Sequence, residues 1–350
     1  MKKAFIVANA LFASIIVLGM QQRDVESDPN GWILRMVSDT DITEATKITK
    51  VKQKIDSVLV DENIDLLEKR GIKDALDFQD NDRNTPLTMA IINGHTGLAK
   101  YLIDNGADIN KEGQYSNTPL IVAIINGHTG LAKYLINQGA DVRKKGQYGW
   151  SSLHWACQHD YDDVVESLVK HGADVNEESG SGFTPLRIAM GNDNENIVKC
   201  LIKNEANINE EDENGYTPLY FAINAYKYGM VKLLIKLGAD IHKENKRGET
   251  PLHIAARRHN ANILKYLLGL GLGVNKKDKN GETPLHVAVN AGSKTNVRLL
   301  IEQGANINER NGAGCTPLEI ARTRGFNEII KILATDKNKQ KVVHSLEVPN

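Results

Sequence analysis

The chain has 350 residues, of which 41% are hydrophobic and 25% are charged, so we expect an ordered, soluble body and not a disordered chain. Its formal net charge of −1 provides no field over the whole protein that would attract nucleic acid. The cysteines are few, odd in number and far apart, which argues against a disulfide framework and against a zinc site.

The N-terminus has the layout of a secretory signal. Two lysines precede an apolar run over residues 4–20 that only Asn9 and Ser14 interrupt, and polar residues follow it. We interpret residues 1–19 as a signal peptide that is cleaved after Gly19, or as a membrane anchor that is retained; a buried helix is a third reading. Cleavage predicts a secreted or periplasmic protein, and retention predicts a membrane tether through residues 4–20.

The next segments are less regular. We expect residues 20–42 to form a linker and residues 43–80 to form a degenerate helical cap, in which residues 64–71 are read as a second helix and its glycine stop. Atypical end units of this kind cover the exposed face of a stack of repeats. At the other end, residues 335–350 are expected to be a polar tail that frays.

Residues 81–334 contain a repeat of fixed length. Thr-Pro-Leu, replaced once by Ser-Ser-Leu, begins every 33 residues, and an alanine lies five residues after each start. The eight starts are Thr85, Thr118, Ser151, Thr184, Thr217, Thr250, Thr283 and Thr316. Eight starts in one register, with no insertion between them, predict eight full structural repeats.

Each repeat is predicted to contain two helices and a turn. The threonine caps a first helix and the proline opens it without loss of a needed donor. Apolar residues at helical spacing form a second helix, which usually ends at a glycine in the left-handed conformation. About ten polar residues, usually with a second glycine, then lead to the next repeat.

This pattern resembles the ankyrin-repeat family, whose signature is T-P-L-H-x-A in a period of 33. The sequence matches it fully over residues 250–255 and 283–288, and with serines over residues 151–156. The resemblance implies an all-α solenoid of helix-turn-helix units, joined by β-turn or hairpin loops, that binds proteins with its concave face. The Met-Lys-Lys start and the many lysines, asparagines and isoleucines look like the product of an AT-rich bacterial gene, and the chain resembles exported ankyrin proteins of host-associated bacteria.

No residue set in the sequence predicts chemistry, so we expect no enzyme, no cofactor and no metal site. Ankyrin histidines at the fourth position of the signature resemble one another in bonding to turn backbone, which implies that role for His154, His253 and His286. His154 and Cys157 are three residues apart on one helix, but the histidine is needed for the repeat. The glycines lie at the repeat period and match no phosphate-binding motif.

We predict that the partner-binding residues are those that depart from the repeat. Aromatic residues make up only 5% of the chain, yet several of them cluster at the hairpin tips. The predicted partner-binding residues are these tip aromatics and two arginines at the end of a first helix: Tyr115, Tyr148, Trp150, Phe183, Tyr216, Arg257 and Arg258. The alternative is that the aromatic rings merely shield neighbouring turns.

Charge along the tips changes sign. The third tip is basic, the fourth and fifth are acidic, and the sixth and seventh are basic again. Such a stripe favours selection of a protein partner by complementarity and disfavours the binding of nucleic acid along the tips.

Taken together, these features predict an exported, monomeric, non-catalytic scaffold for a partner protein. The alternatives are a tethered envelope spacer and an enzyme or toxin with the repeats as its targeting arm.

Two substitutions predict that the middle repeats open first. Ser152 replaces the helix-opening proline, and Glu205 replaces the glycine that ends a second helix. Hydrogen exchange should therefore be faster in the third and fourth repeats than in the seventh and eighth. A centre that is better protected than both ends would contradict this prediction.

Overall fold

The computed structural model describes residues 32–39, 41–59 and 73–335. The chain divides into two compact units, Met1–Ile188 and Ala189–Asn350, and each is described by itself. The predicted signal or anchor, the second helix of the cap and the polar tail all lie outside the described residues.

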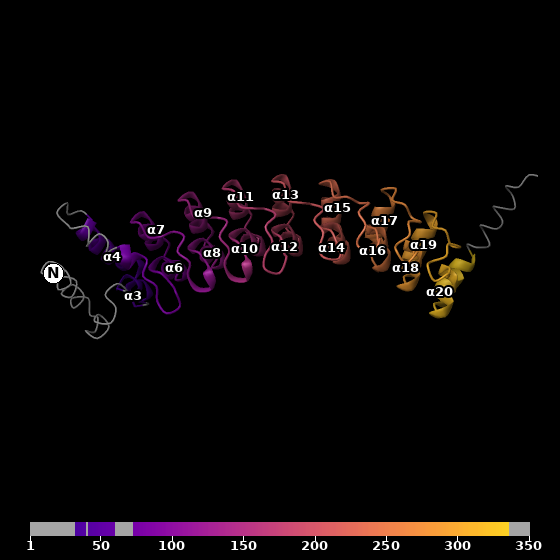
Figure 1. The fold of residues 1–350 in the computed structure, drawn as a ribbon, viewed down its shortest axis with the longest axis horizontal. Coiled ribbons are helices and arrows are strands. Elements are labelled where there is room, and N and C mark those ends of the chain that lie inside the picture. The colour runs from indigo at the N-terminus through magenta and orange to yellow at the C-terminus, as the bar shows by residue number, and fades with distance from the viewer. Residues whose placement is uncertain (1–31, 40, 60–72, 336–350) are drawn as a thin grey trace, which may run out of the picture. The chain divides into compact units, whose positions relative to one another are not determined.

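In the first unit, each repeat is a pair of short antiparallel helices. The first helices pack on one another, and so do the second helices (Figure 1). The helices are α3 (Trp32–Ser38), α4 (Glu44–Leu59), α6 (Pro86–Ile92), α7 (Thr96–Asp104), α8 (Pro119–Ile125), α9 (Thr129–Asn137), α10 (Ser152–Gln158) and α11 (Asp162–Lys170). Single turns of 3₁₀ helix, η1 (Gln114–Ser116) and η2 (Gln147–Gly149), lie at two of the hairpin tips.

The second unit continues the pattern, and the boundary between the units falls within α12 (Pro185–Asn192). Its further helices are α13 (Glu195–Lys203), α14 (Pro218–Asn224), α15 (Tyr228–Lys236), α16 (Pro251–Arg257), α17 (Ala261–Leu268), α18 (Pro284–Asn290), α19 (Lys294–Glu302) and α20 (Pro317–Thr323), followed by helical residues 327–335. Helical pairs therefore extend over all eight predicted repeats.

The segment predicted as a linker contains a helix. In α3, the side chains of Ile33, Met36 and Val37 are buried, and the helix packs against α6. Without α3, the apolar face of the first repeat would be exposed to water, and covering it is favourable. The helix has only seven residues and belongs to no repeat, which is why periodicity did not reveal it.

Helix α4 completes this N-terminal cap with polar contacts. The Lys47 side chain is 2% exposed, and its Nζ lies 2.9 Å from the carbonyl oxygen of Val37 and 3.0 Å from Nε2 of His95. The Glu44 carboxylate accepts a hydrogen bond from the backbone N–H of Gly97, at 2.7 Å. It thereby caps the first turn of α7, where free N–H groups favour a negative charge.

The core of each repeat comes from the leucine and the alanine of the signature. The eight alanines are at most 1% exposed: Ala90, Ala123, Ala156, Ala189, Ala222, Ala255, Ala288 and Ala321. A methyl group at this position lets a first helix approach its neighbour closely, and a larger side chain would force the pair apart. The regular recurrence of alanine is thus a packing requirement.

The signature histidines bond to turn backbone, as the resemblance implied, and the structure shows that the bonds join successive repeats. Nδ1 of His253 accepts from the backbone N–H of Thr250 at 3.1 Å, and Nε2 lies 3.0 Å from the carbonyl oxygen of Glu282 in the next hairpin. His154 and His286 make the equivalent bonds to the carbonyls of Phe183 and Cys315, at 3.0 and 3.2 Å. In each case Nε2 must carry the proton, because a carbonyl oxygen can only accept.

Burial lowers the pKa of His154, His253 and His286, so the folded protein keeps them neutral. The unfolded chain binds protons at these histidines below about pH 6.5, so stability is fully present above that pH and is lost as the pH falls below it. We expect a lower urea midpoint at about pH 5.5 than at about pH 7.5. The difference should be smaller in a His253→Gln/His286→Gln variant than in the exposed-site control His171→Gln; equal differences would contradict the assignment.

The residue that replaces a helix-ending glycine takes the conformation of that glycine. Glu205 has φ 71°, whereas the equivalent Gly238 has φ 98°. A non-glycine residue in this region costs about 1 kcal/mol. We therefore expect Glu205→Gly to raise the free energy of unfolding by about 1 kcal/mol and Gly238→Glu to lower it by a similar amount, as measured by urea denaturation. Loss of stability in Glu205→Gly would show that the side chain contributes more than its backbone costs.

Candidate functional site

Two tip tyrosines of the first unit are held in an unusual backbone conformation. Tyr115 has φ 57° and ψ 26°, and Tyr148 has φ 59° and ψ 15°. Their side chains are 61% and 68% exposed. The residues after them, Ser116 and Gly149, also have positive φ, so each tip is a turn of the type I′ class. Both rings therefore point into solvent from a strained, tightly defined turn.

This conformation is associated with the residue two positions before each tip tyrosine, at the base of the hairpin. In most repeats an Asp, Asn or Ser at the base accepts hydrogen bonds from backbone N–H groups of the tip; Asp278, for example, accepts from Asn280 and Glu282 at 2.8 Å. The two hairpins that carry Tyr115 and Tyr148 have Gly113 and Gly146 at this position, which have no side chain to accept such bonds. The turns then close through a bond between the residues on either side of the two left-handed positions, 3.1 Å in both hairpins.

The other two predicted aromatics of the first unit differ in exposure. Phe183 is 44% exposed, and the Arg187 guanidinium lies 5.0 Å from its ring centroid. Trp150 is half-buried, with its ring 4.7 Å from that of Trp155 and 5.9 Å from that of His154. Phe183 thus belongs with the exposed tips, while Trp150 also covers the start of α10.

Trp155 begins a row of rings that sequence reasoning missed. It stacks on His159 at 6.1 Å, and His159 stacks on Tyr161 at 5.5 Å. Nε1 of Trp155 is buried and has no acceptor in the described part of the chain. Trp155 occupies a first-helix position that holds Met, Val, Ile or Phe in the other repeats, so aligning the repeats would have revealed it.

In the second unit, Tyr216 is half-buried against other aromatic rings. Its centroid lies 5.6 Å from that of Tyr220 and 6.3 Å from that of Phe221. Tyr220 replaces the signature histidine, and its hydroxyl donates to the turn backbone, 3.0 Å from the carbonyl oxygen of Lys243. Burial raises the pKa of Tyr220, which keeps that hydroxyl protonated. Tyr216 therefore has a packing role, whereas Tyr226, which was not predicted, is 48% exposed.

The two predicted arginines of the second unit have different partners. Arg257 forms an ion pair with Glu249, whose side chain is 2% exposed. Burial is the largest effect on the Glu249 carboxyl and raises its pKa, but hydrogen bonds from Asn245 and Arg257 and the nearby Arg247 together hold the pKa below its ordinary value. Arg258, by contrast, donates through Nε to the side-chain oxygen of Asn224, a neutral acceptor, at 2.8 Å.

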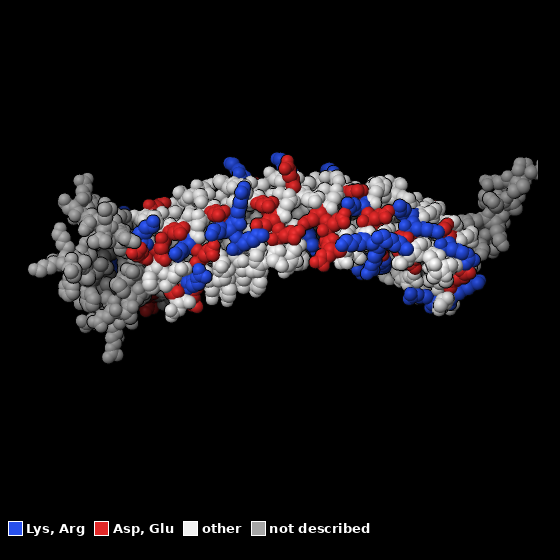
Figure 2. All heavy atoms as spheres, viewed as in Figure 1, with Lys and Arg blue, Asp and Glu red and all other residues white. Residues whose placement is uncertain are grey.

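Much of the charge near the tips is compensated within the chain. Lys144 pairs with Glu112 at 2.8 Å and lowers the pKa of that carboxyl, and Lys145 pairs with Glu177 at 3.1 Å. In the second unit, ion pairs of 2.7 to 3.0 Å join neighbouring repeats at Lys243–Glu211, Lys276–Glu244 and Lys277–Glu309. Figure 2 accordingly shows blue and red side chains lying next to one another. Exposed pairs of this kind contribute little stability, but they reduce the charge offered to a partner.

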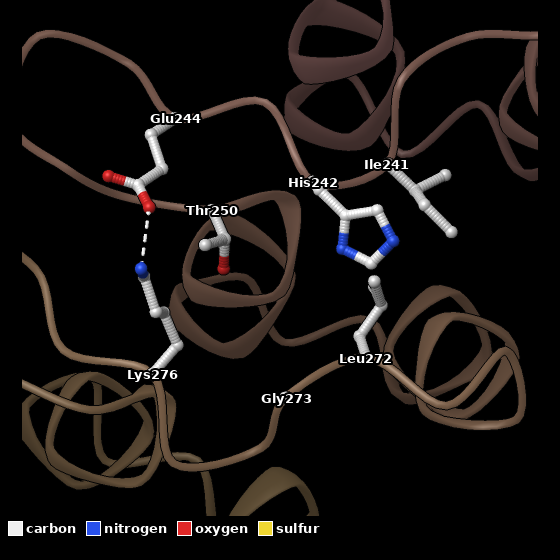
Figure 3. Close-up of a pocket in the computed structure, with 7 residues that line it drawn as sticks. All are labelled: Ile241, His242, Glu244, Thr250, Leu272, Gly273 and Lys276. Atoms are coloured by element: carbon white, nitrogen blue, oxygen red, sulfur yellow. Dashed lines mark ion pairs between the residues drawn. The ribbon is translucent and has the colours of Figure 1, made fainter.

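A shallow pocket of about 340 Å³ lies in the second unit (Figure 3). Its wall includes Ile241, Leu272 and His242, and the Glu244–Lys276 ion pair spans one side, at 3.0 Å. The ion pair leaves few polar groups to orient a small ligand there.

Among the described residues, no three His, Cys, Asp or Glu side chains gather at one point that could hold a metal ion. Both ring nitrogens of His154 are committed to Ser151 and to the Phe183 carbonyl, so His154 does not serve Cys157 as a base.

Within residues 32–39, 41–59 and 73–335, no helix combines the length and the apolar character that crossing a bilayer requires. The run over residues 4–20, on which the predicted tether depends, lies outside these residues.

Comparison with known proteins places the chain in a family. The model described as ankyrin repeats (3 copies) matches residues 110–179, 153–245, 224–311 and 270–344, and a single ankyrin-repeat model matches residues 82–111. Among solved structures, the human ASB11 ankyrin repeat domain is similar, with 27% identity and a TM-score of 0.54 over 64% of this chain and 99% of that chain. No curated protein matches the chain. Since the family matches cover most of the sequence, the protein belongs to the ankyrin-repeat family and has the all-helical ankyrin-repeat solenoid fold that its T-P-L-H-x-A signature predicted.

Proposed function

We propose that this protein is a non-catalytic scaffold that holds a partner protein against the hairpin tips of its first unit. Ankyrin repeats are generally protein–protein interaction scaffolds. The single observation that carries the proposal is the pair of tyrosines, Tyr115 and Tyr148, that the chain holds in solvent at positive φ.

Neither tyrosine stabilises the turn in which it lies. Glycine or asparagine would take the left-handed conformation at lower cost, and tyrosine there costs about 1 kcal/mol. An exposed ring also gains nothing from burial until a partner covers it. Backbone strain combined with exposed aromatic area is typical of a binding site, because tyrosine buries a large, rigid surface at an interface.

The neighbouring aromatics extend the proposed site. Phe183 is exposed at the next tip, and the row from Trp155 through His159 to Tyr161 lies on the same unit. In this proposal the tips and the first helices act together, as the concave face does in ankyrin proteins generally. The partner is a protein, and the scaffold acts as a monomer that needs no cofactor.

The place of action is proposed from the sequence. The signal-like residues 1–19 support export, with the partner outside the producing cytoplasm. The resemblance to exported ankyrin proteins of host-associated bacteria supports an effector or adaptor role. Retention of the segment would give a surface-tethered form with the same binding surface.

The test removes the two rings without disturbing the turns. In a Tyr115→Gly/Tyr148→Gly variant, glycine keeps the left-handed backbone, so the protein should be at least as stable as the wild type in urea. Partners captured from host-cell lysate by the full-length chain should be identified by mass spectrometry and their affinity measured with purified protein. We expect the variant to bind such a partner at least about tenfold more weakly.

The matched control is Ser181→Gly, which changes the equivalent exposed tip position of the next hairpin. It should bind the partner as tightly as the wild type. Full affinity in the double variant would refute the role of the tips. Failure of the wild-type chain to capture any stoichiometric partner would favour the spacer alternative.

A further inference from the structure

The sixth repeat departs from the other repeats at the turn between its two helices. In the others, the residue after the first helix and its cap takes a left-handed conformation, for example Gly94 at φ 73° and Tyr226 at φ 60°. In the sixth repeat the turn is instead extended at Arg258, which has φ −86° and ψ 139°. This conformation carries the chain out of α16 in a different direction from that of its neighbours.

A buried asparagine of the next repeat holds this turn in place. The Asn296 side chain is 0% exposed, and its Nδ2 lies 2.6 Å from the carbonyl oxygen of Arg258 and 3.1 Å from that of Ala256. Its Oδ1 is buried without a partner among the described residues. The equivalent position of every other repeat is apolar and buried: Leu98, Leu131, Val164, Ile197, Met230, Ile263 and Ile329. A buried polar side chain in an apolar slot is costly, so its retention here indicates a requirement for this turn.

The Arg258 side chain is also held in place by specific contacts. Nε and Nη2 both donate to Oδ1 of Asn224, and the guanidinium lies 5.9 Å from the ring centroid of Tyr226. A guanidinium has five N–H donors, so this arrangement leaves one N–H of Nη1 and one of Nη2 side by side along the terminal edge. That edge has the geometry that grips a carboxylate through two parallel hydrogen bonds.

The side chains that contact Arg258 do not neutralise its charge. Its acceptor is an amide, its ring neighbour is a tyrosine, and no described carboxylate forms an ion pair with it. The preceding Arg257 is anchored by the buried Glu249, with 41% of its side chain exposed. Arg257 and Arg258, adjacent in the chain, are thus both held by side chains of the second unit.

We propose that this surface of the second unit, formed by Arg257 and Arg258, binds an acidic segment of a partner protein, with Arg258 as its anchor. The inference rests on the proposed scaffold function and names the chemistry of one ligand of that scaffold. A peptide carboxylate fits the free edge of a pre-oriented guanidinium, and fixing the side chain beforehand reduces the entropy lost on binding.

Charge favours a short acidic segment over a nucleic acid. Many of the nearby lysines are already paired, including Lys243 with Glu211 and Lys276 with Glu244. The carboxylate of Glu249 pairs with Arg257, and that of Glu282 also feels the charge of Arg257. A phosphate backbone needs a run of uncompensated cations, which this surface does not provide, whereas a few carboxylates need only a few.

The test measures fluorescence anisotropy of a labelled peptide of alternating glutamate and serine with the full-length chain at low salt. We expect the wild type to bind it and Arg258→Gln to bind at least about tenfold more weakly. Arg258→Lys keeps the charge but loses the two-bond edge and should be weakened about fivefold. Lys265→Gln, which removes an exposed positive charge from α17, should bind as the wild type does.

A second variant protects the test against simple loss of folding. Asn224→Asp leaves Arg258 in place but puts a carboxylate beneath it, so binding should weaken about as much as in Arg258→Gln while the thermal midpoint is unchanged or raised. Wild-type affinity in both variants would overturn the proposal, as would failure of the wild type to bind the peptide. Tighter, Arg258-dependent binding of a labelled thymidine oligonucleotide would overturn it in favour of nucleic acid.

The same peptide measurement separates this proposal from the proposed function. The Tyr115→Gly/Tyr148→Gly variant changes only the first unit, so it should bind the acidic peptide like the wild type. Loss of partner capture in that variant with intact peptide binding supports both proposals. If the tyrosine double variant still captures the partner while Arg258→Gln loses the peptide, the tip site is rejected and the acidic-segment site is retained.

Discussion

The contact on which the fold depends is a side chain of one repeat that reaches the hairpin backbone of the next. His154, His253 and His286 each use Nδ1 for their own helix cap and Nε2 for a carbonyl of the following hairpin. One buried imidazole ring thereby both caps its own helix and joins two repeats. Since each repeat contacts only its neighbours, stability accumulates through such links along the chain.

Backbone hydrogen bonds between neighbouring hairpins add a second link. The backbone N–H of Gly180 donates to the carbonyl of Tyr148 at 2.9 Å, and Gly312 donates to Asn280 at 2.7 Å. A Cβ on Gly180 would lie 2.8 Å from the Tyr148 carbonyl oxygen, so a side chain there would require the hairpins to shift. The strained Tyr148 turn is therefore anchored to its neighbour, which presents the ring from a fixed backbone.

Both proposed sites arise where a repeat breaks its own pattern. At Tyr115 and Tyr148 the hairpin has lost its polar base residue, and at Arg258 the turn is extended and held by Asn296. Each departure costs folding free energy through left-handed tyrosine or a buried polar group. A regular repeat would avoid these costs, so binding is the benefit that explains them most directly.

The sequence alone determined the period, the helix pairs and the caps, because those features depend on local propensity and on residues that recur at a fixed spacing. It also pointed to Tyr115, Tyr148, Phe183 and Arg258 as departures from that spacing. The structure added that the signature histidines bond across to the next repeat. Only the tertiary structure separated the exposed rings from Trp150 and Tyr216, which pack on Trp155 and Tyr220. It alone placed α3 against α6 and Asn296 beneath Arg258, because such contacts join residues that no local pattern connects.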